Sequence, residues 1–149
     1  MLTVQGDLRT WLAELDRLRS LPVRLNQGWA EDAAEQARKN LGGKGNTAYL
    51  RLRSGATRAS VTVTANAGGA TLSAGGPGLN FQEDGGVIKP KRGKWLTFRI
   101  HEPSDGPQAT GPWVRVRQVR IPARHPVRDA ALYALDHLGD HLDSILGGA

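Results

Sequence analysis

The spacing of apolar residues changes along the chain, and this change limits the fold more than any other feature. Over residues 7–41 apolar side chains recur at steps of three and four, the pattern of an amphipathic helix. Over residues 48–121 they tend to alternate with polar ones, as in strands with one buried face. A helical spacing returns over residues 126–146. This order predicts an α+β fold in a single domain, residues 1–149, a length that can bury its own core.

Pro22 divides the first helical region. Proline removes a backbone donor and clashes with the preceding turn, so we expect two N-terminal helices. The apolar stripe of the first helix consists of Leu8, Trp11, Leu12, Leu15 and Leu18. That of the second consists of Leu25, Trp29, Ala33, Ala37 and Leu41. Asp7 is the expected N-cap of the first helix, and Gly42-Gly43 the expected end of the second.

The middle region predicts an antiparallel meander sheet. Residues 59–65 and 70–74 have the pattern of a hairpin around a turn at residues 66–69. Two further strands are expected at residues 49–53 and 94–100. A loop rich in Pro, Gly, Ser and Asp is expected at residues 102–112.

The clearest strand pattern lies in residues 113–121, and its phase slips. Val114 and Val116 share one face, whereas the apolar residues after Gln118 share the other. A bulge near Gln118 explains the slip. A strand that leaves one sheet to pair elsewhere, for example with a neighbouring subunit, explains it equally well.

A single C-terminal helix is expected over residues 126–146, packed on the sheet. Pro126 suits the first turn of a helix, where its missing donor is not needed. The apolar stripe of this helix consists of Leu132, Leu135, Leu138, Leu142 and Ile145.

Composition excludes several classes of protein. The chain has no cysteine, so it holds neither a disulfide nor a thiolate metal site. It shows no signal-peptide pattern and no apolar run of about 18 residues, so we expect folding in the cytoplasm and no membrane span. The net charge is +6, from 20 Lys and Arg against 14 Asp and Glu. Much of the excess lies between Lys89 and Arg128, whereas Asp136, Asp140 and Asp143 make the C-terminal end acidic.

No catalytic, cofactor-binding or metal site is predicted, and we expect no enzyme activity. His137 and His141 have the spacing of two metal ligands on a helix, but no recognisable third ligand or general base accompanies them. We interpret them as part of a solvated helix face. The glycine-rich runs at residues 42–47 and 75–78 lack the spacing and the strand–helix context of phosphate-binding loops.

Two segments, in order, resemble one family. Residues 81–98 read Phe-Gln-Glu-Asp-Gly-Gly-Val-Ile-Lys-Pro-Lys-Arg-Gly-Lys-Trp-Leu-Thr-Phe, and residues 113–124 read Trp-Val-Arg-Val-Arg-Gln-Val-Arg-Ile-Pro-Ala-Arg. They resemble the neck and tail-completion proteins of tailed phages, which combine Gln-Glu-x-Gly-Gly, x-Ile-x-Pro-Lys, an apolar strand, a variable loop and a strand ending in Ile-Pro-Ala-Arg-Pro. The likeness by motif covers about residues 54 to 135. The chain departs from the pattern in placing His125 before Pro126.

The resemblance implies a structural virion protein that joins or completes the head–tail region, at the neck or upper tail. It implies a homo-oligomeric ring, with six-fold symmetry favoured over twelve-fold, stacked on connector, tail-terminator or tail-tube proteins. We expect the protein to be made in the host cytoplasm and to end in the virion. The candidates for assembly contacts are Gln82, Glu83, Gly85, Gly86, Ile88, Pro90, Ile121, Pro122 and Arg124.

The basic residues indicate an alternative, a nucleic-acid-binding module. The candidates for facing DNA are Lys89, Lys91, Arg92, Arg115 and Arg117. Alternating arginines are also typical of the solvated face of a sheet or of a guarded edge strand. We find no aromatic side chains interleaved with these cations for base stacking, which argues against sequence-specific or single-strand recognition.

Overall fold

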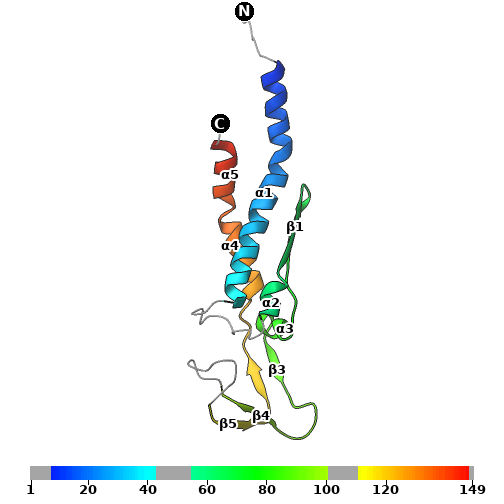
Figure 1. Ribbon diagram of the computed structural model, residues 1–149, viewed down its shortest axis with the longest axis vertical. Coiled ribbons are helices and arrows are strands. Elements are labelled where there is room, and N and C mark those ends of the chain that lie inside the picture. Colours follow the sequence, from blue (N-terminus) through cyan, green and yellow to red (C-terminus); the bar gives the residue numbers. More distant parts are fainter. Residues whose placement is uncertain (1–7, 43–54, 101–110, 148–149) are drawn as a thin grey trace, which may run out of the picture.

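The computed structural model describes residues 8–42, 55–100 and 111–147. These residues form an elongated molecule (Figure 1), with a long helix and a bent C-terminal helix towards one end and two small strand pairs at the other. The expected N-cap Asp7, the expected strand at residues 49–53 and most of the expected loop at residues 102–112 lie outside the described residues.

Helix α1 (Leu8–Gly42) is continuous, so the prediction of two N-terminal helices is wrong. Pro22 lies inside this helix and is exposed, so the carbonyl whose hydrogen bond it removes can be hydrated. Tertiary contacts hold the helix on both sides of the proline. Arg17 donates to the carbonyls of Ile145 and Leu146 at 2.8 and 2.7 Å, and Asn26 donates to the carbonyl of Asn66 at 2.7 Å.

The expected hairpin is confirmed and lies along α1. A helical turn, α2 (Ala56–Ala59), precedes it, so β1 (Thr62–Asn66) begins later than expected and pairs with β2 (Gly69–Ser73). Its apolar residues are half-buried and face the helix, whereas its threonines are exposed, as the alternation predicts.

The meander prediction is wrong, because the described strands form three separate two-stranded sheets. After α3 (Leu79–Glu83), β3 (Gly86–Ile88) pairs with β6 (Val119–Ile121), and β4 (Leu96–Arg99) pairs with β5 (Trp113–Val116). The chain changes partner between β5 and β6, where the apolar phase slips. Of the two explanations for the slip, the change of partner holds, and it occurs within the subunit.

The C-terminal helix is bent and packs on α1 rather than on a sheet, which corrects the prediction. It consists of α4 (Pro126–Asp136) and α5 (Leu138–Gly147), separated at His137. Pro126 takes the expected place in the first turn of α4. The predicted stripe holds on α5, where Ile145 is buried and Leu138 and Leu142 are half-buried. It is wrong on α4, where Leu132 and Leu135 are exposed and the buried residues are Ala130 and Ala134.

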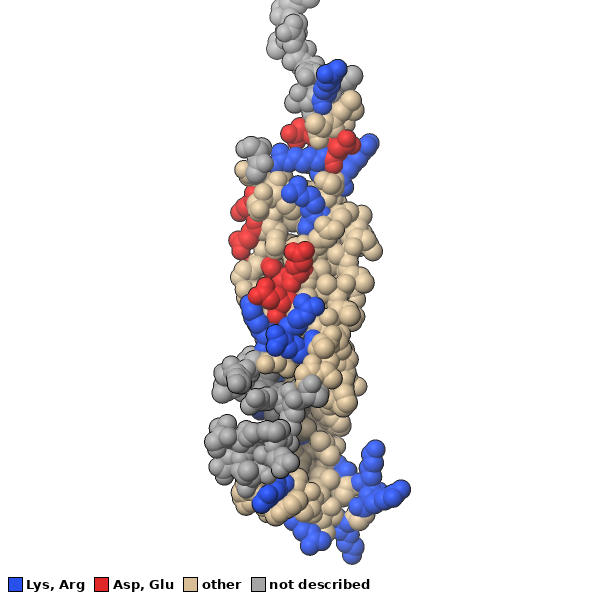
Figure 2. Space-filling model, viewed as in Figure 1, with Lys and Arg blue, Asp and Glu red and all other residues tan. Residues whose placement is uncertain are grey.

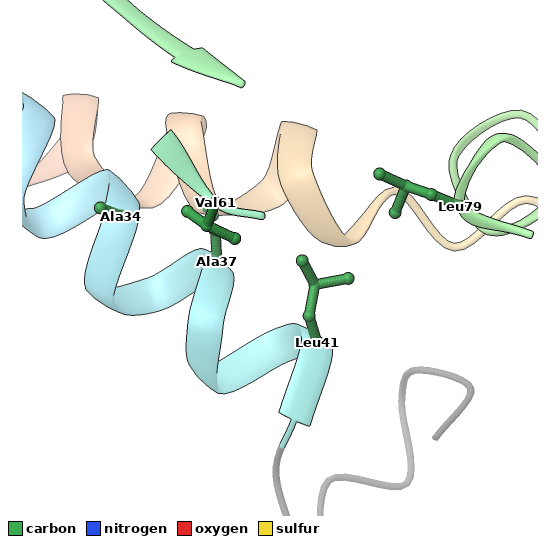
Figure 3. Close-up of a cluster of buried hydrophobic side chains, with 6 residues drawn as sticks. Ala34, Ala37, Leu41, Val61 and Leu79 are labelled. Atoms are coloured by element: carbon green, nitrogen blue, oxygen red, sulfur yellow. The ribbon is translucent and has the colours of Figure 1, made fainter. Parts of the chain in front are cut away.

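The core lies where α1, the hairpin, α3 and α4 meet (Figure 3). Its buried members are Ala34, Ala37, Leu41, Val61, Leu79 and Ala130. Several of them are alanines, which let the helix backbones approach closely. None of the helices in the described ranges is both long enough and apolar enough to cross a membrane.

Enlarging a helix-contact alanine tests this packing. We expect Ala134→Leu to lower the free energy of unfolding by about 1–3 kcal/mol, because Ala134 is fully buried and the added methylenes must push α4 away from its neighbours. Urea unfolding measures the change. The control Leu132→Ala, at an exposed position of the same helix, should change stability by less than about 0.5 kcal/mol. Equal stability of the two variants would contradict the packing described.

Candidate functional site

The two segments that carry the family resemblance meet in space. We call their meeting point the joint, residues 81–88 and 119–127. The Gln82 carbonyl accepts the N–H groups of Arg124 and His125 at 2.7 and 3.1 Å. The Glu83 carboxylate accepts the N–H of Val127, in the first turn of α4. A carboxylate distant in sequence therefore satisfies a donor that the helix itself leaves unpaired.

Only glycine fits at position 85 of the joint. Its φ is +70°, a region that L side chains rarely adopt, and an added Cβ would lie 2.7 Å from the Ala123 nitrogen and 2.8 Å from the Ile121 oxygen. A Cβ on Gly86 would lie 2.8 Å from the Phe81 ring. The Gly-Gly pair thus lets one segment of the motif lie directly against the other.

Most of the residues predicted to make assembly contacts belong to this joint. Gln82 is 2% exposed, and its Oε1 has no hydrogen-bond partner among the described residues. Pro122 is the exposed member of the predicted set, and Pro90 lies beyond the joint, after β3. The joint connects α4 to the β3–β6 pair within the subunit, and an assembly contact through it stays a prediction.

The predicted DNA-facing residues lie beyond the joint, on what we call the arm, residues 89–100 and 111–118. Lys89, Lys91 and Arg92 occupy the connection from β3 to β4, whereas Arg115 and Arg117 lie on β5 and directly after it. All five are exposed. Figure 2 shows Lys and Arg gathered at this end, where the described atoms in view include no Asp or Glu. The arm is therefore a basic projection.

Strand pairing gives the arm two unlike faces. Leu96 pairs with Val116 and Phe98 with Val114, which places apolar side chains on one face. Arg99 pairs with Trp113 on the other face, where its guanidinium lies 5.4 Å from the centre of the Trp113 ring.

The second face also carries Trp95, which the guanidinium groups of Arg115 and Arg117 approach to 5.6 and 5.3 Å. Aromatic rings and cations therefore alternate on this face, at distances typical of cation–π contacts. The expectation that aromatics do not interleave with the cations is wrong. The alternation was present in the sequence, but it becomes one face only once β4 and β5 pair in this register.

The histidine pair does not act as a unit. His141 Nε2 lies 2.8 Å from Asp32 Oδ2, whereas His137 Nδ1 lies 2.8 Å from the Tyr133 carbonyl oxygen and its ring stacks on the Tyr133 ring. Within the described ranges no group of three or more His, Asp and Glu side chains gathers. His141 joins α5 to α1, a structural role that its spacing did not reveal.

The first half of α1 carries a stripe of exposed apolar side chains, which we call the helix stripe. The exposed fractions are 62% for Trp11, 53% for Leu12, 47% for Leu15 and 56% for Leu18. Further down, a hollow of about 210 Å³ lies between α1, β2 and the bent helix, lined by Asn26, Trp29, Ala70, Leu135 and Leu138. Both features are apolar surfaces open to a partner.

Lys39 illustrates the surface charge on α1. Its Nζ lies 2.6 Å from Glu35 Oε1, and this hydrogen bond, together with the charge of the carboxylate, raises the pKa of Lys39 above its ordinary value. Both side chains of the pair are exposed.

Comparison with known proteins identifies no relative: no family model, no curated protein and no solved structure matches the chain. The joint, the arm and the helix stripe are therefore the features from which a function can be inferred.

Gly85 and Gly93 form a matched pair of substitutions. Both have a positive φ, but a Cβ on Gly93 meets no atom within 4 Å, whereas a Cβ on Gly85 meets backbone. We expect Gly93→Ala to cost about 1 kcal/mol of stability from backbone strain alone. Gly85→Ala should cost at least about 2 kcal/mol more, because the joint must also open. Thermal or urea unfolding of both variants checks this, and equal losses would show that the two segments do not touch at Gly85.

Proposed function

We propose that the chain is a structural protein of a tailed-phage particle, which completes or joins the head–tail region by assembling into a ring. It acts by shape and contact, without catalysis. The observation that carries the proposal is the helix stripe, because large apolar side chains on a helix remain exposed where the subunit stands alone.

Burial of this stripe would supply the driving force for association. Monomeric proteins rarely leave contiguous large apolar side chains in water. Burying a Leu or Trp side chain completely contributes about 1.5–3 kcal/mol, so even partial burial of Trp11, Leu12, Leu15 and Leu18 favours a subunit contact. The stripe lies at one end of the molecule and the arm at the other, so contacts at the two ends differ in chemistry.

The joint supports the family resemblance on which the neck or upper-tail role rests. The Gln-Glu-Asp-Gly-Gly and Ile-Pro-Ala-Arg pieces are not scattered, because Gly86 pairs with Ile121 and the Gln82 carbonyl accepts from Arg124. The pieces act as one structural unit, as a shared motif requires.

A ring follows from unlike contacts. A patch that meets a different patch on the next copy generates a ring when the rotation closes and a filament when it does not. We propose a six-fold ring, with twelve-fold as the alternative, stacked on connector, tail-terminator or tail-tube proteins. We place three cations of the connection from β3 to β4 nearest to passing DNA, namely Lys89, Lys91 and Arg92.

A nucleic-acid-binding module is the second candidate function, favoured by the interleaved Arg and Trp side chains of the arm. Such a module binds duplex DNA as an isolated subunit, with an affinity that falls steeply as salt rises. A fluorescence anisotropy titration against a duplex of arbitrary sequence, between about 50 and 200 mM salt, distinguishes the candidates.

Native mass spectrometry of the purified chain, alone and mixed with connector and tail proteins, tests the ring. We expect a closed oligomer, formed alone or only with a partner. The variant Leu15→Asp, Leu18→Asp should remain folded, because both positions are exposed, but should lose most of this oligomer. Glu14→Gln is the control on the same helix and should assemble as the parent does. A chain that stays monomeric with every partner and instead binds DNA would contradict the proposed ring.

A further inference from the structure

We propose that the Arg–Trp face of the arm of one copy docks on the outer face of α4–α5 of a second copy. The docking face of the helix consists of Leu132, Leu135, Asp136, Asp140 and Asp143. This contact rests on the proposed ring and names the surfaces that would form it.

The arm carries cations without partners of opposite charge in the described residues. Arg99, Arg115 and Arg117 are exposed, and their described contacts are with the rings of Trp113 and Trp95. A guanidinium stacked on an indole is held in place while its N–H groups remain free to bind a carboxylate. The face is therefore preorganised for acidic groups.

The bent helix carries the complementary charges. Asp136, Asp140 and Asp143 are exposed, and no described residue forms an ion pair with them. Asp140 and Asp143 lie three residues apart on α5, or about 4.5 Å of helix, and Asp136 is the last residue of α4. Arg115 lies on β5 and Arg117 follows it, about 7 Å apart along the chain. The carboxylates of α5 and the two arginines are therefore spaced closely enough for both arginines to meet the same acidic face.

Trp113 supplies an apolar anchor for the same contact. Its side chain is 67% exposed, although a buried indole is among the strongest contributors to an interface. The hollow of about 210 Å³ is lined by Trp29, Leu135 and Leu138, and Asp136 lies between these two leucines in the sequence. An indole from another copy can enter it while the arginines reach the carboxylates.

One copy cannot make this contact with itself. The arm lies at the opposite end of the molecule from α5 (Figure 1), and neither β4 nor β5 makes an extensive contact with any described helix. The occupant is therefore a second copy. Duplex DNA would use the arginines alone and would leave Trp113 and the helix carboxylates without partners.

Two charge-reversed variants test the contact. Arg115→Glu with Arg117→Glu makes the arm acidic, and Asp140→Lys with Asp143→Lys makes the helix face basic. Each variant alone opposes like charges at every contact, so its association constant should fall at least about tenfold. In an equimolar mixture, every acidic arm can meet a basic helix face and every basic arm an acidic one. Assembly should return, and native mass spectrometry should find the two variants in equal numbers.

Two controls and one further variant accompany the pair. Arg24→Glu and Glu31→Lys make the same kinds of charge change at exposed positions of α1, outside both faces, and should leave association unchanged. Trp113→Ala should weaken association at least about tenfold without lowering the melting temperature, because the side chain is exposed in the single subunit.

The outcomes separate this contact from the ring itself. Unchanged assembly of both charge-reversed variants overturns the docking contact and leaves the ring in place. Loss of assembly without recovery on mixing also overturns it. If the arm variant then loses salt-sensitive binding to duplex DNA, the arm is assigned to nucleic acid instead. A parent chain that never assembles overturns both the contact and the ring.

Discussion

Small side chains let α4 lie directly against α1, and the other elements depend on this contact. Ala37 and Ala130 are fully buried in the core, so the backbones of the two helices are kept apart by little more than methyl groups. Two hydrogen bonds hold α4 in register. Asn40 Nδ2 donates to the Pro126 carbonyl at 2.8 Å, and Trp29 Nε1 donates to the Ala131 carbonyl at 3.3 Å. Close packing of this kind gains dispersion contacts along the whole helix pair, although each alanine buries little area. The β1–β2 hairpin packs its apolar face against α1 and completes the core.

The start of α4 connects the α1–α4 helix pair to the strand pairs. His125, with a φ of +52°, and Pro126 begin the helix, and the Gln82 and Glu83 groups bind the backbone at that point. Hydrogen bonds therefore join the end of α3, just before β3, to the start of α4. The arm continues from the β3–β6 pair as a two-stranded hairpin, a structure that is marginal in water unless something packs on it. The first half of α1, at the opposite end of the molecule, likewise exposes apolar side chains to solvent. The helix stripe and the arm, both exposed among the described residues, suit the proposed subunit, which would complete its packing in an assembly.

The basic and acidic side chains are also separated along the molecule. The arm is basic and the outer face of the bent helix is acidic, so the chain carries complementary surfaces at separate places. Complementary charges add specificity and speed to association more than they add affinity. In the assembly that we propose, the apolar helix stripe and Trp113 are therefore assigned most of the binding energy. His141 and Asp32 bind each other across helices, and Lys39 pairs with Glu35 on the surface.

The sequence by itself determined which residues share a face of α1 and of the β1–β2 hairpin. The period of its apolar residues predicted helices at both ends, the hairpin, the strand containing Leu96, the change of phase near Gln118 and the helix beginning at Pro126. The tertiary structure alone decided which element each face meets. Helix α1 continues through Pro22 because contacts on both sides outweigh a local penalty of about 3 kcal/mol. The bent helix meets α1 instead of a sheet, and the Arg–Trp face exists only because β4 pairs with β5. Periodicity is a local property of one segment, whereas partner choice depends on contacts between residues far apart in the chain, which no spacing rule records.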